Sequence, residues 1–117
     1  DAAAPAERLA DAVQRAQAYL AAGADCIYPI GLDDRATLAA LVQAIDAPVN
    51  VAAGPGVPGL AELARLGVAR VSTATRLATL ALAAVDQAAG AMLESGRFDG
   101  LAAGLAYADV QRMFVHA

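Results

Sequence analysis

The residues of this chain that are best suited to contact a ligand lie directly after three short apolar runs, in the segments 30–34, 53–56 and 72–76. The turn Gly54-Pro55-Gly56 would let a ligand approach the backbone closely, although glycine and proline also form a tight turn without any ligand. In the last segment, Ser72 and Arg76 could hold a phosphate or a carboxylate. Thr75 beside them is equally suited to cap a helix, which would leave Arg76 as a solvated first-turn residue.

Three further polar residues lie within or beside these runs. Asn50 interrupts an apolar run, so its amide needs hydrogen-bond partners, either a substrate inside the fold or a backbone group. Asp33 and Asp34 could form a carboxylate pair or bind a metal ion, and either of them could instead cap the helix that follows.

The residue types that are rare or missing narrow the chemistry of this chain. All eight basic residues are arginines, so no lysine is present to form a Schiff base with a carbonyl substrate. The only cysteine, Cys26, begins an apolar run and is predicted to be a small buried side chain rather than a nucleophile. The only histidine, His116, precedes the last residue and is predicted to be solvated. One cysteine and one histidine form no zinc-binding pattern.

Composition and charge exclude some partners. The formal net charge of −4 argues against a nucleic-acid partner, which would require a basic face. No apolar run reaches the ~18 uninterrupted residues of a membrane span, because Arg76, Asp86 and Glu94 break the longest one. No signal-peptide pattern opens the sequence. We therefore expect a cytoplasmic protein without membrane contact.

The apolar runs themselves predict a strand-helix array. Strands are expected at 26–30, 48–53 and 68–73, with helices from Pro5 to about Gly23, from Asp33 or Asp34 to Ile45, over 60–66, over 75–95 and over 107–115. The long helix carries an apolar stripe, made of Leu77, Leu80, Leu82, Val85, Ala89 and Met92.

Such an array is typical of parallel α/β folds, in which helices must cover both faces of the sheet. Three strands and 117 residues are too few for a complete eight-stranded α/β barrel of ~250 residues. The sequence begins at Asp1 and its helical pattern is already running by Glu7, so we expect a piece of a longer barrel, with 1–117 as one structural unit. In such barrels the active site lies at the carboxyl ends of the strands, which is where the three polar segments fall.

Three stretches of this sequence resemble the C-terminal half of the isocitrate lyase/phosphoenolpyruvate mutase family: 22–32, 47–56 and 66–72. The resemblance implies a (β/α)8 TIM-type barrel in which the predicted strands are the sixth, seventh and eighth. It also implies homo-oligomers that exchange a C-terminal helix, for which the helices over 75–95 and from Tyr107 are the candidates.

The resemblance further implies Mg²⁺-dependent cleavage or rearrangement of C–C or P–C bonds in small 2-oxo or hydroxy acids, through a pyruvate-type enolate. Family members carry their metal ligands, their substrate-clamping arginine and, in the lyases, their catalytic cysteine in the first five strands. All of these would precede Asp1, so no catalytic or metal-binding residue is predicted in this chain, and Cys26 does not match the catalytic cysteine. The predicted substrate contacts are Asn50, Gly54, Gly56 and Ser72.

The sequence departs from the better-known branches of that family. It has Ile30 where phosphoenolpyruvate mutases carry a histidine, and Ala52-Ala53-Gly54-Pro55 where methylisocitrate lyases carry an Asn-x-Thr-Glu run. Its turns look more like a phosphonomutase-like branch. The leading hypothesis is a metal-dependent lyase or mutase whose catalytic machinery lies outside this chain. Two alternatives are a non-catalytic assembly fragment that pairs its open sheet edges with a partner, and a different barrel enzyme that binds phosphate through 54–56 and 72–76.

Overall fold

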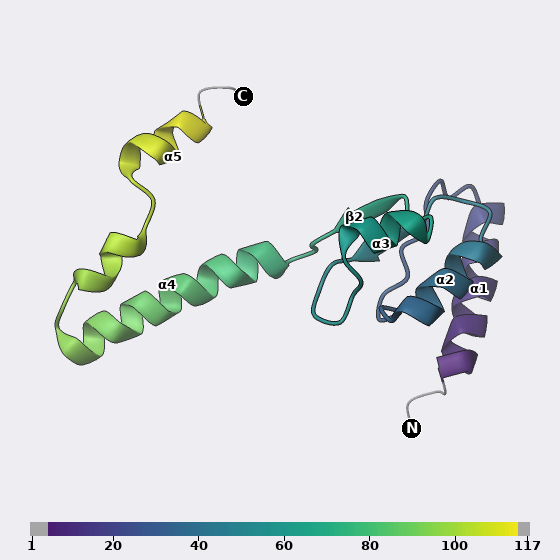
Figure 1. Ribbon diagram of the computed structural model, residues 1–117, viewed down its shortest axis with the longest axis horizontal. Helices are drawn as coiled ribbons and strands as arrows, with labels where there is room; N and C mark the ends of the chain where they lie inside the picture. The colour runs from purple at the N-terminus through teal and green to yellow at the C-terminus, as the bar shows by residue number, and fades with distance from the viewer. Residues whose placement is uncertain (1–4, 115–117) are drawn as a thin grey trace. The chain divides into compact units, whose positions relative to one another are not determined.

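The computed structural model describes residues 5–114 and divides the chain into two compact units, the first ending at Arg76 and the second beginning at Leu77. The first unit has an α/β architecture (Figure 1), with elements α1 (Pro5–Ala21), α2 (Arg35–Ala44), β1 (Asn50–Ala52), α3 (Leu60–Arg65) and β2 (Arg70–Ser72). The second unit contains α4 (Arg76–Ser95, whose first residue belongs to the first unit), a 3₁₀ helix (Asp99–Ala103) and α5 (Tyr107–Met113). His116 lies outside the described residues.

The ends of α1 and α2 follow from local sequence. Pro5 occupies the first position of α1, where its missing N–H has no intrahelical partner to lose. α1 ends in a Schellman motif, in which the Ala24 N–H donates to the Tyr19 carbonyl and the Gly23 N–H to the Leu20 carbonyl. At α2 the Asp34 carboxylate accepts a hydrogen bond from the Thr37 N–H at 3.0 Å, so Asp34 rather than Asp33 is the cap.

The two strands form a short parallel sheet. Asn50 is paired with Arg70, Val51 with Val71, and Ala52 with Ser72. Both strands are shorter than the predicted segments 48–53 and 68–73.

The predicted strand at 26–30 is wrong as a full strand, because only one parallel bridge, between Ile27 and Val49, is present. The Ile27 N–H donates to the Pro48 carbonyl and the Asn50 N–H to the Ile27 carbonyl. The next donor in such a ladder would be the backbone nitrogen of residue 29. Pro29 has no N–H, so the ladder stops there.

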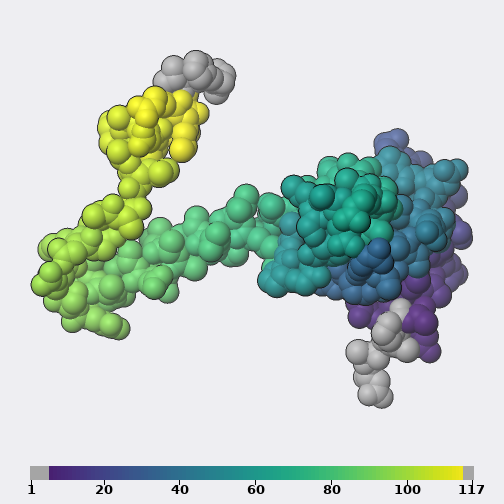
Figure 2. Space-filling view, viewed as in Figure 1, coloured from purple at the N-terminus to yellow at the C-terminus, as the bar shows by residue number. Residues whose placement is uncertain are grey.

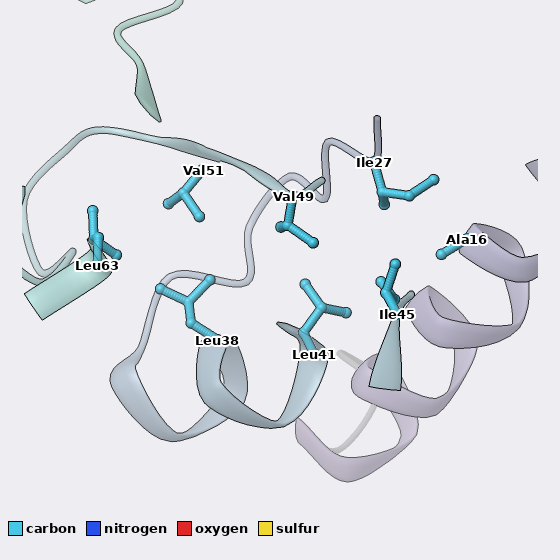
Figure 3. Packing of buried hydrophobic residues seen from close by; sticks show 8 residues of the cluster. All are labelled: Ala16, Ile27, Leu38, Leu41, Ile45, Val49, Val51 and Leu63. Carbon is cyan, nitrogen blue, oxygen red and sulfur yellow. The ribbon is translucent and has the colours of Figure 1, made fainter. Parts of the chain in front are cut away.

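The core of the first unit lies on one face of the sheet (Figure 3). Leu38 and Leu41 of α2 are fully buried against Val49 and Val51, and Leu63 of α3 completes the contact. Ala16, Ile27 and Ile45 extend the same cluster. In the space-filling view the side chains of this unit pack into a continuous body (Figure 2). Because side chains alternate along a strand, Asn50 and Ala52 point to the opposite face from Val49 and Val51.

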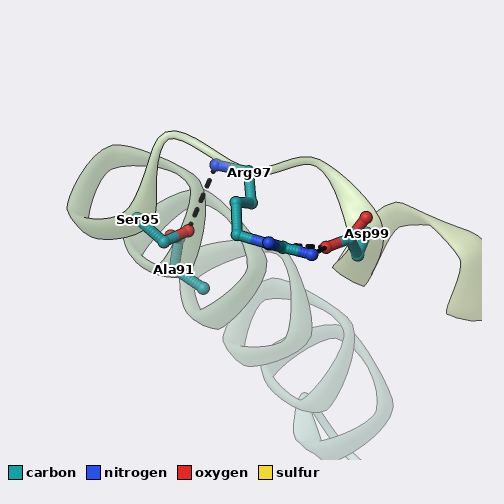
Figure 4. Close-up of polar contacts among 4 residues, drawn as sticks. All are labelled: Ala91, Ser95, Arg97 and Asp99. Atoms are coloured by element: carbon teal, nitrogen blue, oxygen red, sulfur yellow. Dashed lines mark hydrogen bonds and ion pairs between the residues drawn. The ribbon is translucent and has the colours of Figure 1, made fainter.

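The second unit is apolar in sequence but exposed. None of the residues of α4, the 3₁₀ helix or α5 is buried, and the predicted stripe includes Leu80, which is 67% exposed. At the end of α4 the Ser95 hydroxyl donates to the Ala91 carbonyl and accepts from the Arg97 N–H, while the Arg97 side chain pairs with Asp99 (Figure 4). These contacts lie at the carboxyl end of α4, where Gly96 adopts a positive φ of 67° that ends the helix.

By length and composition alone, α4 is also long and apolar enough to cross a membrane. A single such helix is weak evidence, since core helices of globular proteins meet the same criterion. The carboxylate of Asp86 lies near the middle of α4, where a charge would be costly in a bilayer.

Candidate functional site

Asn50 is the centre of a polar group on the sheet face opposite the core. Its side chain is fully buried, and its Nδ2 donates to the Ser72 Oγ at 2.9 Å. Its Oδ1 accepts from the Arg70 Nε at 3.0 Å. The Asn50 amide is therefore bound by two side chains of β2. The sequence analysis had considered a substrate or a backbone group as its partner. No buried side-chain nitrogen or oxygen lacks a partner among the described residues.

Arg70 is the member of this group that the sequence analysis missed. It is two residues before Ser72, so both side chains leave β2 on the same face, and it is paired with Asn50 across the sheet. The alternation of Arg70, Val71 and Ser72 is visible in the sequence. The register that places Arg70 opposite Asn50 is not, because residues 53–69 separate the two strands.

Ser72 lies at the carboxyl end of β2. Its hydroxyl is the hydrogen-bond acceptor of Asn50, and its backbone carbonyl accepts from the Ala53 N–H at 2.7 Å. Its side chain is only partly buried. Ser72 thus connects the buried amide with the edge of the sheet at which both strands end.

The loop after β1 is a tight turn, in agreement with the simpler interpretation of its glycines. The Val57 N–H donates to the Gly54 carbonyl at 3.2 Å, Pro55 follows Gly54, and Gly56 has a φ of 87°. Proline and then a residue with positive φ are the signature of a type II turn, which explains Gly56 without a ligand.

Gly54 has a different role, because a side chain lies against it. A Cβ atom at this position would be 2.8 Å from the Cζ and Nη2 atoms of Arg76 and 2.9 Å from its Nε. Such distances are too short for any residue except glycine unless the guanidinium moves. The structure therefore brings Arg76 of the predicted segment 72–76 onto the end of β1, where it is exposed.

The remaining candidate residues form no site. Hydrogen bonds from the Thr37 hydroxyl and N–H lower the pKa of the exposed Asp34 carboxyl, as expected for a helix cap. Cys26 is exposed, so the prediction of a buried cysteine is wrong. It follows the Asp25 turn, with its Sγ 3.9 Å from the Ile27 carbonyl oxygen. Within residues 5–114 no three His, Cys, Asp or Glu side chains come together to hold a metal ion.

The first unit also has a groove away from the polar group around Asn50. A groove of about 570 Å³ runs between α1 and the segment 24–32. Its polar contacts are internal: Arg8 donates to the Gly31 carbonyl, and Asp11 pairs with Arg15 at 2.9 Å and raises the pKa of that guanidinium. Asn50, Gly54, Gly56 and Ser72 do not line it. A smaller hollow of about 200 Å³ includes Gly54 but is otherwise lined mostly by apolar residues of the loop, α3 and β2.

Residues 1–93 match the sequence profile of phosphoenolpyruvate phosphomutase. The chain belongs to the phosphoenolpyruvate phosphomutase family. This confirms the resemblance drawn from the sequence, and the family is one of lyase/mutase-type enzymes. Enzymes of this family generally use Mg²⁺. The residues described here do not provide a set of ligands for that ion.

The chain is similar to a protein of related sequence and to a solved structure. An uncharacterized protein of Mycobacterium tuberculosis, found in two strains, is 37% identical over 103 residues, which are 88% of this chain and 38% of that protein. A crystal structure from Burkholderia cenocepacia, with a provisional lyase/mutase assignment, is 42% identical and superposes with a TM-score of 0.83 over 91% of this chain and 39% of its own. The chain thus spans about two fifths of the length of these relatives.

Proposed function

We propose that this chain forms strands six to eight of a (β/α)8 barrel in a Mg²⁺-dependent lyase or mutase. The enzyme would act on C–C or P–C bonds of a small 2-oxo or hydroxy acid. The observation that carries the proposal is the polar group of Asn50, Arg70 and Ser72 on the sheet face that carries no core. Together with the family, it supports the proposal that this face lines the interior of a substrate-binding barrel.

The arrangement of the sheet supports the barrel. Parallel sheets are found with both faces covered, and the helices of the first unit pack on the Val49 and Val51 side alone. In the proposed barrel the segment around Ile27 would be strand six, β1 strand seven and β2 strand eight. Residues 1–117 would then be the C-terminal part of a single barrel domain.

The pocket wall that this chain would supply consists of Asn50, Gly54, Gly56 and Ser72. Gly54 and Ser72 are at the carboxyl ends of β1 and β2, the end of a barrel at which active sites form. Gly56 acts through the turn that shapes the loop. The catalytic groups and the Mg²⁺ ligands would lie in the barrel strands outside this chain, so the isolated chain would be inactive.

The proposed setting is a cytoplasmic homo-oligomer that binds neither nucleic acid nor membrane. Exchange of α4 or α5 between subunits would cover side chains such as Leu80 and Val85, which are 67% and 66% exposed. The acidic net charge of −4 argues against a nucleic-acid partner.

A second candidate function is a barrel enzyme that binds a phosphate ester. The position of the Arg76 guanidinium over Gly54 favours it, because arginine is well suited to bind phosphate oxygens at a strand end. A non-catalytic assembly role, in which the open sheet edges pair with a partner, is the third possibility.

A product screen on the complete protein separates these functions. The complete protein is incubated with Mg²⁺ and a panel of 2-hydroxy acids, 2-oxo acids and phosphonates, and the products are identified by mass spectrometry with and without EDTA. EDTA-sensitive C–C or P–C cleavage or rearrangement would support the lyase/mutase proposal. If a phosphate ester but not Mg²⁺ with pyruvate analogues raises the melting temperature, the phosphate-binding alternative replaces it.

A further inference from the structure

The orientation of the Asn50 amide is determined by its neighbour Arg70. A guanidinium carries only N–H donors, so the amide atom that faces the Arg70 Nε must be the oxygen. The amide nitrogen therefore faces Ser72, 2.9 Å from its Oγ, and must be the donor of that hydrogen bond. Burial of Asn50 holds this arrangement in place.

The direction of these bonds decides what the Ser72 hydroxyl can do. A hydroxyl has one proton and two lone pairs, and here one lone pair accepts the Asn50 N–H. The proton cannot point to the amide nitrogen, so it is left for another acceptor. Ser72 is partly exposed at the carboxyl end of β2, which is the end at which a barrel binds its substrate.

Arg70, Asn50 and Ser72 are linked by two successive hydrogen bonds, and the first donor in this series is the positively charged guanidinium. The Arg70 guanidinium donates to the Asn50 oxygen, and the Asn50 nitrogen donates to the Ser72 oxygen. Hydrogen bonds in such a chain polarise one another, and a donor at the end of the chain binds a negatively charged oxygen most strongly.

We infer that the Ser72 hydroxyl donates a hydrogen bond to an anionic oxygen of the substrate, a carboxylate or a phosphate oxygen, and that Asn50 and Arg70 position it for this contact. The inference rests on the proposed function for the location of the site and adds the chemistry that the site recognises. Ser72 is the contact residue, whereas Asn50 acts through Ser72 and Arg70 acts through Asn50.

A single substitution can reverse the direction of the hydrogen bond between residues 50 and 72 while keeping the shape of the side chain. In Asn50→Asp the carboxylate can only accept hydrogen bonds, so it would take the proton of the Ser72 hydroxyl as well as the Arg70 N–H. The hydroxyl would then have no proton for a ligand. Ser72→Ala removes the donor altogether, and Ser72→Thr keeps it on a residue that suits a strand.

The test measures dissociation constants of the complete protein for two probes, oxalate with Mg²⁺ and inorganic phosphate, by calorimetry. Ser72→Ala and Asn50→Asp should each weaken binding of at least one probe by about tenfold to a hundredfold, the range for a hydrogen bond to a charged group. Ser72→Thr should stay within about threefold of the parent. In the double variant, Asn50→Asp should cause a smaller loss than it does alone, because its effect on the hydroxyl proton is gone and only its added negative charge remains.

Three results would overturn the inference: unchanged binding in folded Ser72→Ala, additive losses in the double variant, or no binding of either probe by the parent protein. Melting temperatures identify variants that fail to fold, and Arg70→Gln then serves as the milder change, since its amide can still donate to Asn50 but carries no charge. It should weaken binding less than Ser72→Ala does, and equal or greater loss would contradict the assigned roles.

The outcome is independent of the product screen. Turnover of an oxo acid with an unchanged KM in Ser72→Ala would leave the proposed function intact and end the inference. If oxalate or phosphate binding depends on Ser72 but the protein has no lyase or mutase activity, the inference about Ser72 stands and the proposed function is wrong.

Discussion

At the scale of single residues, the contact between Gly54 and Arg76 places a positive charge at the end of β1. The Arg76 guanidinium occupies the space that a side chain at residue 54 would need, since a Cβ added to Gly54 would lie 2.8 to 2.9 Å from three guanidinium atoms. In the proposed barrel the substrate would bind at this end of the strands. The contribution of the Arg76 charge to binding can therefore be tested by substituting Gly54.

Gly54→Ala should weaken binding of oxalate or phosphate to the complete protein while leaving it folded, because the new methyl group displaces the Arg76 guanidinium. The expected loss is severalfold to about a hundredfold, the range for a hydrogen bond to a charged group. Gly59→Ala is the matched control, since a Cβ there meets nothing within 4 Å. Calorimetry measures both, and equal affinities in the two variants would contradict the role of Gly54.

Asp34 gives a pH-dependent prediction. Its pKa is lowered in the folded chain because it accepts hydrogen bonds from the Thr37 hydroxyl and N–H, so the unfolded chain binds more protons in this range. The stabilisation is fully present above the unfolded pKa of about 3.9 and is lost as the pH falls through the lower folded value. Compared with Asp34→Asn, the parent should lose stability between pH 5 and 2, as measured by urea unfolding at each pH. Parallel pH profiles would contradict the cap.

Some of this site could be predicted from residue types alone. Asn50 interrupts an apolar run and therefore had to find partners, and Ser72 ends a run at the side where parallel strands carry function. The identity of the partners could not be predicted, because Arg70 meets Asn50 only through the strand register. The approach of Arg76 to Gly54 depends on the path of residues 73–76, which no local pattern encodes.

At the scale of elements, helix bounds followed the sequence more closely than strand bounds did. Helices carry their own end signals, such as Asp34 and Gly23, and each predicted helix is present within a few residues. A strand is defined by its neighbours, so the apolar run 26–30 could not reveal that Pro29 would end its ladder after Ile27. The 3₁₀ helix Asp99–Ala103 was not predicted, because Gly100 within it and Gly104 after it are more typical of a loop.

Truncating a core side chain of the first unit should strongly lower the free energy of unfolding. Leu41 of α2 is fully buried against the sheet, so Leu41→Ala should lower the free energy of unfolding by about 2–5 kcal/mol. Leu60→Ala, at a leucine that is 72% exposed, should change it by less than about 0.5 kcal/mol. Urea titration followed by circular dichroism measures the two variants. Equal costs would mean that the face formed by Val49, Val51 and α2 is not the core.

At the scale of the whole molecule, three features indicate surfaces that this chain does not cover itself. It covers about two fifths of its relatives, has helices packed on one face of its sheet, and leaves the apolar side chains of α4 exposed. Further barrel strands would cover the polar face of the sheet, and neighbouring subunits would cover the apolar side chains of α4. The strand-helix array alone predicted a piece of a longer barrel, and the matching family profile confirms the family to which the sequence pointed.

Helix exchange between subunits predicts a change of oligomeric state. Val85→Glu on α4 should shift the complete protein towards monomers, because it places a charge in the proposed contact. Gln87→Glu on the same helix adds the same charge away from the stripe and should leave the mass unchanged. Light scattering gives the masses, and a parent protein that is already monomeric would refute the exchange.

This chain is proposed to form the wall of a substrate pocket whose catalytic groups lie elsewhere in the protein. The most direct test compares Mg²⁺-dependent turnover of small oxo and hydroxy acids by the complete protein and by residues 1–117 alone, at equal concentrations. We predict turnover by the complete protein and none by residues 1–117. Turnover by residues 1–117, or no lyase or mutase activity in the complete protein, would contradict the account.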